Sequence, residues 1–130
     1  MSAKTDYLED AVINHVLRNT SYTSPTTVYL ALLTADPTDA GTQTNEVSGG
    51  SYARVAVAFD APSPSGETQN TSLLAFPTAS AGWGTVSHWA VADALTSGNY
   101  LYHGAFDTAK PVSSADDFEI AAGEFEINET

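Results

Sequence analysis

Short apolar stretches alternate along most of the chain with segments rich in Gly, Pro, Ser, Thr and Asp. The clearest alternation follows the Gly49-Gly50 pair, whose conformational freedom suits a tight reversal of the chain. Successive side chains of an extended backbone point to opposite faces. Residues 52–59 then present Ala53, Val55, Val57 and Phe59 on one face and Tyr52, Arg54, Ala56 and Ala58 on the other. This period of two is typical of an antiparallel strand with one face on a core.

Eight segments have strand character, either by alternation or by their content of β-branched and aromatic residues. They occupy residues 27–34, 52–59, 68–70, 73–76, 85–92, 100–106, 117–120 and 124–127. The first of them is apolar on both faces, which predicts a central strand that is covered on each side.

Turn residues between these segments predict two hairpins. Segments 85–92 and 100–106 flank a Ser-Gly-Asn turn and form the clearest one. Segments 117–120 and 124–127 flank an Ala-Ala-Gly turn and form the second. Residues 36–48, rich in Thr, Asp and Gly, are predicted to be a long exposed loop.

Residues 6–18 have the pattern of a helix, with Asp6 as its N-cap and Glu9 three positions later. Its apolar stripe, at helical spacing, contains Leu8, Ala11, Val12, His15 and Val16, with Tyr7 at the edge. We expect this stripe to cover one side of the central strand.

Together these elements predict an all-β protein: a compact antiparallel β-sandwich of about eight strands with one N-terminal α-helix. We expect a single domain over residues 1–130, with the helix at about 6–18 and the sandwich at about 26–128. The chain has neither heptads nor an internal repeat, so the sequence does not predict a long fibrous shaft.

The chain has sixteen Asp and Glu residues but only four Lys and Arg residues, which gives a formal net charge of −12. This balance argues against nucleic acid and against an anionic membrane surface as partners. No apolar run is long enough to span a membrane, and the N-terminal residues lack the pattern of a signal peptide. The absence of cysteine excludes disulfides and thiolate metal sites. The acidity indicates either a solubilising surface or a face that points away from packed nucleic acid.

Two histidines lie in the first predicted hairpin. Alternation places His88 on the same face as Val86 and Ala90, and His103 on the same face as Leu101 and Ala105. Paired strands could bring both imidazoles together, and Asp93 or Asp107 would then complete a metal site; the alternative is two histidines that serve packing. The sequence contains no nucleophile elbow and no calcium-loop pattern. We therefore predict no enzyme activity, metal or cofactor. A hydrolase stays open as a third class of function, with His88 and His103 as the place to look.

Large aromatic residues gather around the first hairpin, and alternation places Trp89 on the face opposite His88. Bulky groups on both faces of a strand are typical of either a core or a subunit interface. The residues predicted to contact partners are Tyr22, Pro25, Tyr52, Arg54, Trp83, His88, Trp89, Tyr102 and His103.

Several segments resemble a family of short tailed-bacteriophage virion structural proteins often labelled "phage tail fibre protein". They include residues 7–11, 14–20, 24–32, 47–54, 83–89 and 101–105, with the motifs Phe76-Pro77 and Lys110-Pro111. The resemblance runs from about residue 7 to residue 127. It implies a structural protein of the virion, made in the host cytoplasm, that binds other phage structural proteins and brings no catalytic residues. The acidic C-terminal segment, with Glu119, Glu124, Glu126 and Glu129, departs from the family's pattern.

Two positions in the virion fit this resemblance. A capsid decoration, or cement, protein would bind the major capsid protein on the outer shell and stabilise it; strong acidity and compact size favour this reading. A tail-tip or tail-fibre-associated adaptor is the alternative, and the family label favours it. Decoration proteins commonly follow capsid symmetry, so we expect a homo-oligomer, with a trimer as the working hypothesis.

Overall fold

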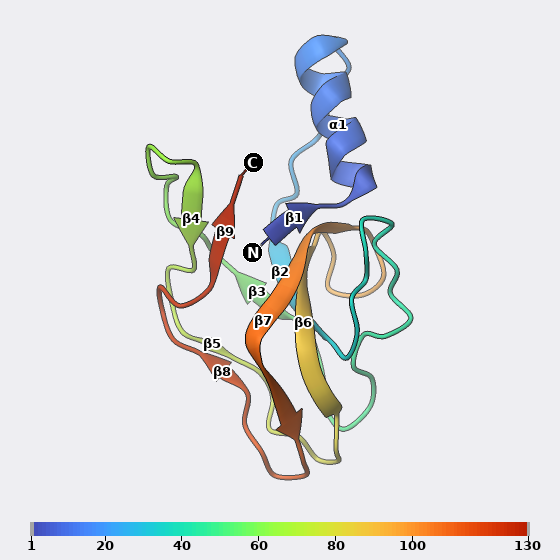
Figure 1. Ribbon diagram of the computed structural model, residues 1–130, viewed down its shortest axis with the longest axis vertical. Coiled ribbons are helices and arrows are strands. Elements are labelled where there is room, and N and C mark those ends of the chain that lie inside the picture. Colours follow the sequence, from blue (N-terminus) through green and yellow to red (C-terminus); the bar gives the residue numbers. More distant parts are fainter. Residues whose placement is uncertain (1, 130) are drawn as a thin grey trace.

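Strands dominate the computed structural model, which describes residues 2–129 (Figure 1). Within these residues, nine strands and one helix follow one another. They are β1 (Ser2–Lys4), α1 (Asp6–Leu17), β2 (Val28–Leu33), β3 (Val55–Val57), β4 (Glu67–Gln69), β5 (Leu74–Ala75), β6 (Gly84–Ala92), β7 (Tyr100–Val112), β8 (Glu119–Ile120) and β9 (Glu126–Asn128). The predicted all-β class with a single N-terminal helix is confirmed.

The strands form one large antiparallel sheet and two small ribbons. The sheet has five strands in the order β1-β7-β6-β2-β3, and β2 lies between β6 and β3 as a central strand. The ribbons are the pairs β4-β9 and β5-β8. They form the second layer of the sandwich, because their apolar residues share a core with one face of the sheet.

The main core lies between the sheet and the two ribbons. The Trp89 ring of β6 meets Phe125, which directly precedes β9, at a centroid distance of 4.7 Å and an interplanar angle of 87°. Phe76, which follows β5, meets Phe118, which precedes β8, in a similar edge-to-face contact at 5.7 Å. Aromatic pairs of this kind contribute about 0.5–1.5 kcal/mol beyond their area burial. The Trp89–Phe125 contact joins the β4-β9 ribbon to the sheet, whereas the Phe76–Phe118 contact lies within the β5-β8 ribbon.

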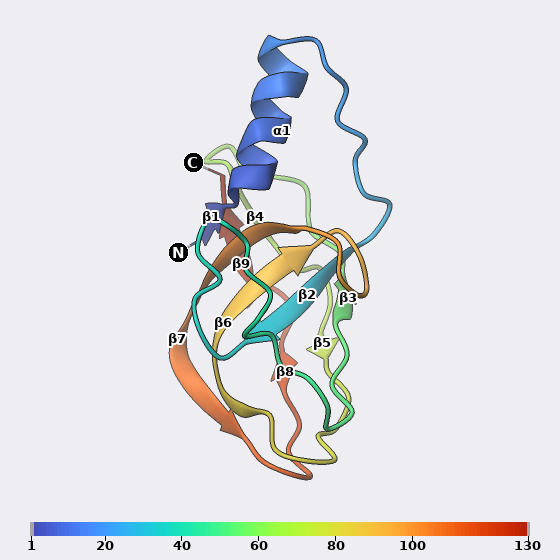
Figure 2. The same ribbon diagram turned by 90° about the vertical axis from the view of Figure 1, so that its right-hand side faces the viewer.

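A second, smaller core occupies the other face of the sheet and contains Ala31, Leu33, Ala90, Ala92 and Tyr100. The helix was expected to cover this face, and that expectation is wrong. Residues 36–48, which follow β2, cover it instead, as Figure 2 shows, and we call them the covering segment. In this segment Pro37 is fully buried, and Gly41 approaches the Tyr100 side chain so closely that a Cβ at position 41 would lie 3.6 Å from Tyr100 Cβ.

The prediction that residues 36–48 are an exposed loop is therefore wrong in part. Val47 is buried in the main core, and its N–H donates to Leu32 O at 3.0 Å. A bridge pairs Glu46 with Leu33 at the end of β2. The polar composition of the segment is that of a loop, but its apolar residues Pro37 and Val47 are buried against the sheet.

One predicted hairpin is confirmed and the other is wrong. Strands β6 and β7 pair over most of their length, from Gly84 with Val112 to Ala92 with Tyr100. The segments around residues 117–127 do not pair with each other. β8 pairs with β5, and β9 pairs with β4, so both reach partners about 50 residues earlier in the chain.

A bulge in β6 changes which residues share a face. The register of β6 against β7 shifts between Val86 and His88. As a result Val86 lies in the main core with Trp89, whereas Ala90 lies in the smaller core. The expectation that His88 shares a face with Val86 is wrong, because strict alternation fails wherever a bulge inserts an extra residue.

Candidate functional site

Helix α1 is anchored to the body of the protein by its first turn. Thr5, not Asp6, is the N-cap: its Oγ1 accepts a hydrogen bond from Leu8 N at 3.4 Å and donates one to Tyr100 O at 2.6 Å. The Asp6 N–H donates to Asp39 O at 2.7 Å, and the buried Leu8 side chain completes the anchor. The helix bounds agree with the prediction to within one residue, but the N-cap differs by one position.

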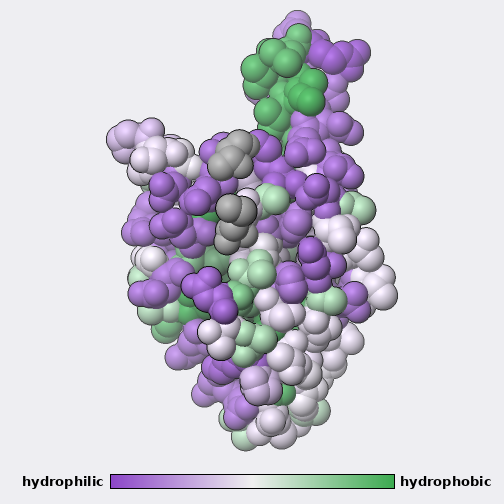
Figure 3. All heavy atoms as spheres, viewed as in Figure 1, coloured by the Kyte–Doolittle hydropathy of each residue, from purple (hydrophilic) through white to green (hydrophobic). Residues whose placement is uncertain are grey.

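Beyond this turn α1 leaves the body and projects into solvent (Figures 1 and 2). Four apolar residues of its last two turns are exposed, and we call them the α1 tip: Val12, Ile13, Val16 and Leu17. Val16 is 68% exposed and Leu17 is 76% exposed. Figure 3 shows hydrophobic residues gathered at the far end of the helix, above a hydrophilic base. Fully burying a side chain of this kind stabilises by about 1.5–3 kcal/mol, so the tip is suited to contact with another surface.

Polar contacts at the end of α1 turn the chain back toward the sheet. Arg18 caps the helix and donates from Nη1 to Asn14 Oδ1 at 2.7 Å. Asn19 adopts a positive φ of 53°, which ends the helix. The Tyr22 N–H then donates to His15 Nδ1 at 3.2 Å, so the returning segment runs beside the helix. These contacts hold the tip in a defined orientation.

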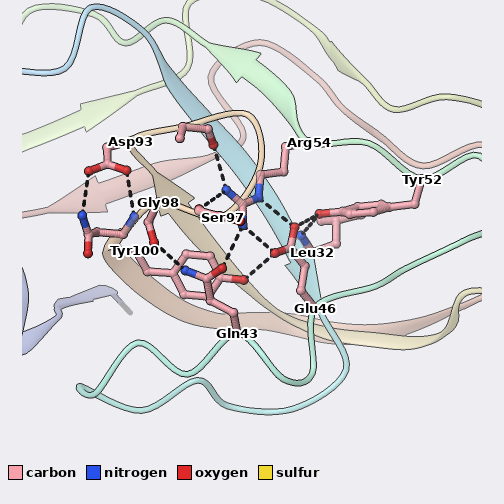
Figure 4. A network of polar contacts seen from close by, with 11 residues as sticks. Leu32, Gln43, Glu46, Tyr52, Arg54, Asp93, Ser97, Gly98 and Tyr100 are labelled. Atoms are coloured by element: carbon pink, nitrogen blue, oxygen red, sulfur yellow. Dashed lines mark hydrogen bonds and ion pairs between the residues drawn. The ribbon is translucent and has the colours of Figure 1, made fainter.

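A network of buried polar groups holds the covering segment against the sheet (Figure 4). Glu46 is its centre. Its two carboxylate oxygens accept hydrogen bonds from Arg54 Nε at 2.8 Å and Arg54 Nη2 at 2.7 Å. They also accept from Tyr52 Oη at 2.7 Å and from Tyr100 Oη at 2.8 Å. Arg54 in addition donates to the carbonyl oxygens of Ala94 and Ser97, each at 2.8 Å.

The electrostatics of this network favour a charged Glu46. Burial alone would raise the pKa of Glu46, but the hydrogen bonds from Arg54, Tyr52 and Tyr100 outweigh it and lower the pKa below its usual value. Burial and the neighbouring carboxylate raise the pKa values of Tyr52 and Tyr100, so both phenols stay protonated as donors. Every strong donor in the network already has an acceptor within the chain, which is typical of a hydrogen-bond network that stabilises the fold.

The two histidines of the β6-β7 pair lie near each other but meet different partners. His103 Nε2 is 2.9 Å from Asp39 Oδ1, and its Nδ1 is 3.7 Å from Asp36 Oδ1. His88 Nδ1 is 2.8 Å from Ser87 Oγ. Within residues 2–129, no group of three or more His, Asp or Glu side chains lies together in a way that could hold a metal ion. The carboxylates next to His103 come from the covering segment, and not from Asp93 or Asp107 as the sequence suggested.

The structure places the nine residues predicted to contact partners in three settings. Trp83, Trp89, Tyr52 and Arg54 take part in contacts inside the chain: Trp83 and Trp89 are buried, and Trp83 Nε1 donates to Gly50 O at 2.9 Å. His103 is buried beside Asp39, and the other four are half-buried: Tyr22, Pro25, His88 and Tyr102. Contact of any of the nine with a partner stays a prediction.

The sequence analysis did not identify the α1 tip as a candidate surface, although the number of apolar residues in the helix indicates one. Val12 and Val16 were assigned to a core-facing stripe, and Ile13 and Leu17 were not considered. Together the four residues make the apolar surface of the helix wider than its first turn, with the buried Leu8, can cover against the body.

Comparison with protein-family models gives a match that covers nearly the whole chain. A family model described as "Podophage GP4 fiber I protein gp80" matches residues 3–128. Among curated proteins there is no match. Within residues 2–129, no helix has the length and apolar character that crossing a membrane requires.

Proposed function

The chain belongs to the phage fibre family described as Podophage GP4 fiber I protein gp80, and from this membership we propose that it acts as a tail-fibre-associated assembly protein of the virion. The family makes it a phage structural protein. Its place at the tail, and its role as an adaptor that joins other fibre or tail chains, are the proposal. The observation that carries the proposal is the family match, because it covers residues 3–128 and so leaves almost none of the chain outside.

Capsid decoration, the reading that the sequence favoured, has weaker support. It depended on strong acidity and compact size, and both properties suit an adaptor at the tail equally well. The family description instead names a fibre. We therefore prefer the tail position and keep the capsid shell as the outcome that would contradict it.

The α1 tip supports an assembly role. It is an apolar surface held on a rigid helix away from the body, and its first turn is fixed by hydrogen bonds to β7 and to the covering segment. A helix that presents residues spaced three and four apart is a common means of docking into an apolar groove. We propose that this tip is the contact through which the protein joins its assembly.

The chemistry of the remaining surface is consistent with protein partners. A net charge of −12 disfavours contact with DNA and with anionic lipid. The partners that we propose are other phage structural proteins, with further copies of this chain among them. A trimer remains the working hypothesis for the homo-oligomer.

Copy number in purified virions tests the position. Quantitative mass spectrometry against the major capsid protein should give roughly 3 to 18 copies for a tail component, because tail assemblies follow low rotational symmetry. A copy number on the order of hundreds would contradict the proposal and restore capsid decoration. Absence from the virion would contradict both positions and reopen the question of an enzyme.

A second measurement tests the contact. Phage that encode Leu17→Asp should lose the protein from the particle, whereas phage that encode Leu73→Asp should keep it. Leu73 is the matched control, because it is an exposed leucine outside the α1 tip. Equal incorporation of both variants would contradict the role of the tip.

A further inference from the structure

An apolar groove lies between the sheet and the β4-β9 ribbon, and we call it the β4-β9 groove. It encloses about 470 Å³. Its walls are formed largely by Val28, Phe59, Pro62, Val91, Leu101 and Ile127. Four of these residues belong to or border the main core: Val91 and Ile127 are members, and Val28 and Phe59 pack against it. Val28 and Phe59 are only partly buried, so the edge of the core reaches solvent here.

The groove has an acidic margin. Asp60, Glu67 and Glu129 contribute to its lining. Glu129 is held in place from two sides, because both Lys4 Nζ and Tyr102 Oη donate hydrogen bonds to its carboxylate. Lys4 balances the charge of Glu129, so Asp60 and Glu67 give the edge of the groove its net negative charge. A suitable occupant is an apolar group beside a cation.

The α1 tip has this combination of properties. Its four apolar residues are followed directly by Arg18, whose guanidinium is exposed and bonded only to Asn14 among the contacts described above. The other three cations of the chain, Lys4, Arg54 and Lys110, lie outside the tip. A positive charge at the end of a helix also offsets the negative end of the helix dipole as it approaches carboxylates.

The tip of a chain does not fill that chain's own groove. The groove adjoins the start of α1, since Lys4 of β1 bonds Glu129 at its margin. Twelve helical residues span about 18 Å, and the tip occupies the far half of that length. The anchor at Thr5 and Leu8 fixes the direction of the helix away from the body. The groove and the tip can therefore meet only between two molecules.

We propose that the α1 tip of one copy inserts into the β4-β9 groove of a second copy, with Arg18 beside the acidic margin. This inference rests on the proposed assembly role of the tip and names its partner. The contact joins two different surfaces, so it forms a reciprocal pair or a small ring where the geometry closes and an open filament where it does not. It removes from solvent the exposed apolar residues of the tip and, in the groove, the exposed Pro62 and the half-buried Val28 and Phe59.

Light scattering of the purified protein over a range of concentrations tests the contact. The wild type should form a closed oligomer, and Leu17→Asp should be a monomer. Pro62→Glu, which places a charge on the wall of the groove at an exposed position, should also be a monomer. Leu73→Asp should keep the wild-type mass. Circular dichroism verifies that each variant is folded.

A mixing experiment distinguishes this contact from simple pairing of two helices. Leu17→Asp retains an intact groove, and Pro62→Glu retains an intact tip. Mixing the two monomeric variants should restore a complex. If tips paired with tips, Pro62→Glu alone would still associate, and that result would overturn the proposal.

A charge exchange tests the place of Arg18. Arg18→Glu and Glu67→Arg should each weaken association by about tenfold, and the double variant should recover most of the loss. Equal, additive losses in the double variant would contradict the proposed orientation.

The outcomes separate this inference from the proposed function. A wild-type protein that is monomeric at every concentration would overturn contact between copies. If Leu17→Asp still abolished incorporation into virions, the assembly role of the tip would stand with a different partner. If the oligomer formed as proposed but the protein were absent from virions, the contact would stand and the assigned function would fail.

Discussion

Glu46 and Arg54 form a bidentate, buried ion pair, with Arg54 Nη2 2.7 Å from Glu46 Oε1 and Arg54 Nε 2.8 Å from Glu46 Oε2. Only 3% of the Arg54 side chain and 15% of the Glu46 side chain are exposed. Neither residue belongs to a strand. The pair therefore joins two segments outside the strands. Because Arg54 also donates to Ala94 O and Ser97 O, it connects the covering segment to the turn between β6 and β7.

Replacing Arg54 should destabilise the protein strongly. Arg54→Leu leaves the Glu46 carboxylate buried without its cation, and the loss of one partner from a buried pair typically costs about 3–5 kcal/mol of unfolding free energy. Urea denaturation measures this loss. Arg18→Leu is the matched control, since Arg18 is exposed and should change the stability of the monomer by less than about 0.5 kcal/mol. A loss of unfolding free energy below about 1 kcal/mol for Arg54→Leu would contradict the stabilising role of this ion pair.

Acid should weaken the stabilisation that the Glu46–Arg54 pair provides. The pKa of Glu46 is lower in the folded state than in the unfolded chain, so its contribution is complete above the unfolded value of about 4.5 and disappears as the pH falls through the folded value. The difference in unfolding free energy between the wild type and Glu46→Gln should accordingly shrink below about pH 4.5. Paired urea titrations from pH 7 to pH 3 measure it. A difference that stays constant over this range would refute the assignment.

The two adjacent glycines before β3 should differ in their tolerance of alanine. Both have positive φ, 73° at Gly49 and 57° at Gly50, so alanine costs about 1–2 kcal/mol at either position. At position 49 a Cβ would meet nothing within 4 Å. At position 50 it would lie 2.7 Å from Ala81 O and 2.9 Å from Trp83 Nε1. Gly50→Ala should therefore lose about 1–3 kcal/mol more than Gly49→Ala, measured by thermal unfolding; similar losses would contradict the close approach.

Replacing the leucines at the two ends of α1 should change the unfolding free energy by very different amounts. Leu8→Ala removes a buried side chain and should lower the unfolding free energy by about 2–4 kcal/mol. Leu17→Ala should change it by less than about 0.5 kcal/mol in dilute, monomeric protein, because that side chain is exposed. Chemical denaturation at low concentration compares the two. A large loss for Leu17→Ala in the monomer would mean that the tip packs on its own chain.

Asn70 should prove essential to the β4-β9 ribbon. It is buried at 1% exposure, its Oδ1 accepts from Phe125 N at 2.9 Å, and its Nδ2 donates to Ser72 O and Ala121 O. Asn70→Ala leaves these groups without partners, and an unsatisfied buried group costs about 1–3 kcal/mol. Hydrogen exchange of the Phe125 amide should accelerate in the variant. Exposed Asn45→Ala is the control, and equal protection of Phe125 in both would refute the role of Asn70.

Long-range pairing is where sequence reasoning failed most clearly. Residues 117–127 have the alternation and the central turn of a hairpin, and the turn does form, since Glu124 N donates to Ala121 O at 3.1 Å. The flanking strands nevertheless pair with β4 and β5. Phe118 and Phe125 enter the main core from this arrangement, where each meets an aromatic partner. The burial of these rings outweighs the local preference for a hairpin.

The environment of Arg54 shows the same limit at the level of one residue. Alternation along residues 52–59 placed Tyr52 and Arg54 on an outward face, because it assumed one extended strand. The positive φ values at Gly49, Gly50 and Ser51 and the hydrogen bond from Tyr52 N to Gly49 O delay the strand until Val55. Tyr52 then packs edge-to-face on Trp83, and Arg54 reaches Glu46.

The amino-acid sequence by itself determined the features that depend on near neighbours: the helix, the β6-β7 hairpin, the all-β class and the similarity to phage fibre proteins. Helical and strand periodicity and turn chemistry operate over a few residues, so they can be followed along the chain. Only the tertiary structure decided which surfaces are already covered, and it left the α1 tip and the β4-β9 groove open while it buried Arg54 and Trp89. Burial depends on competition among segments far apart in the sequence, and no local pattern encodes its outcome.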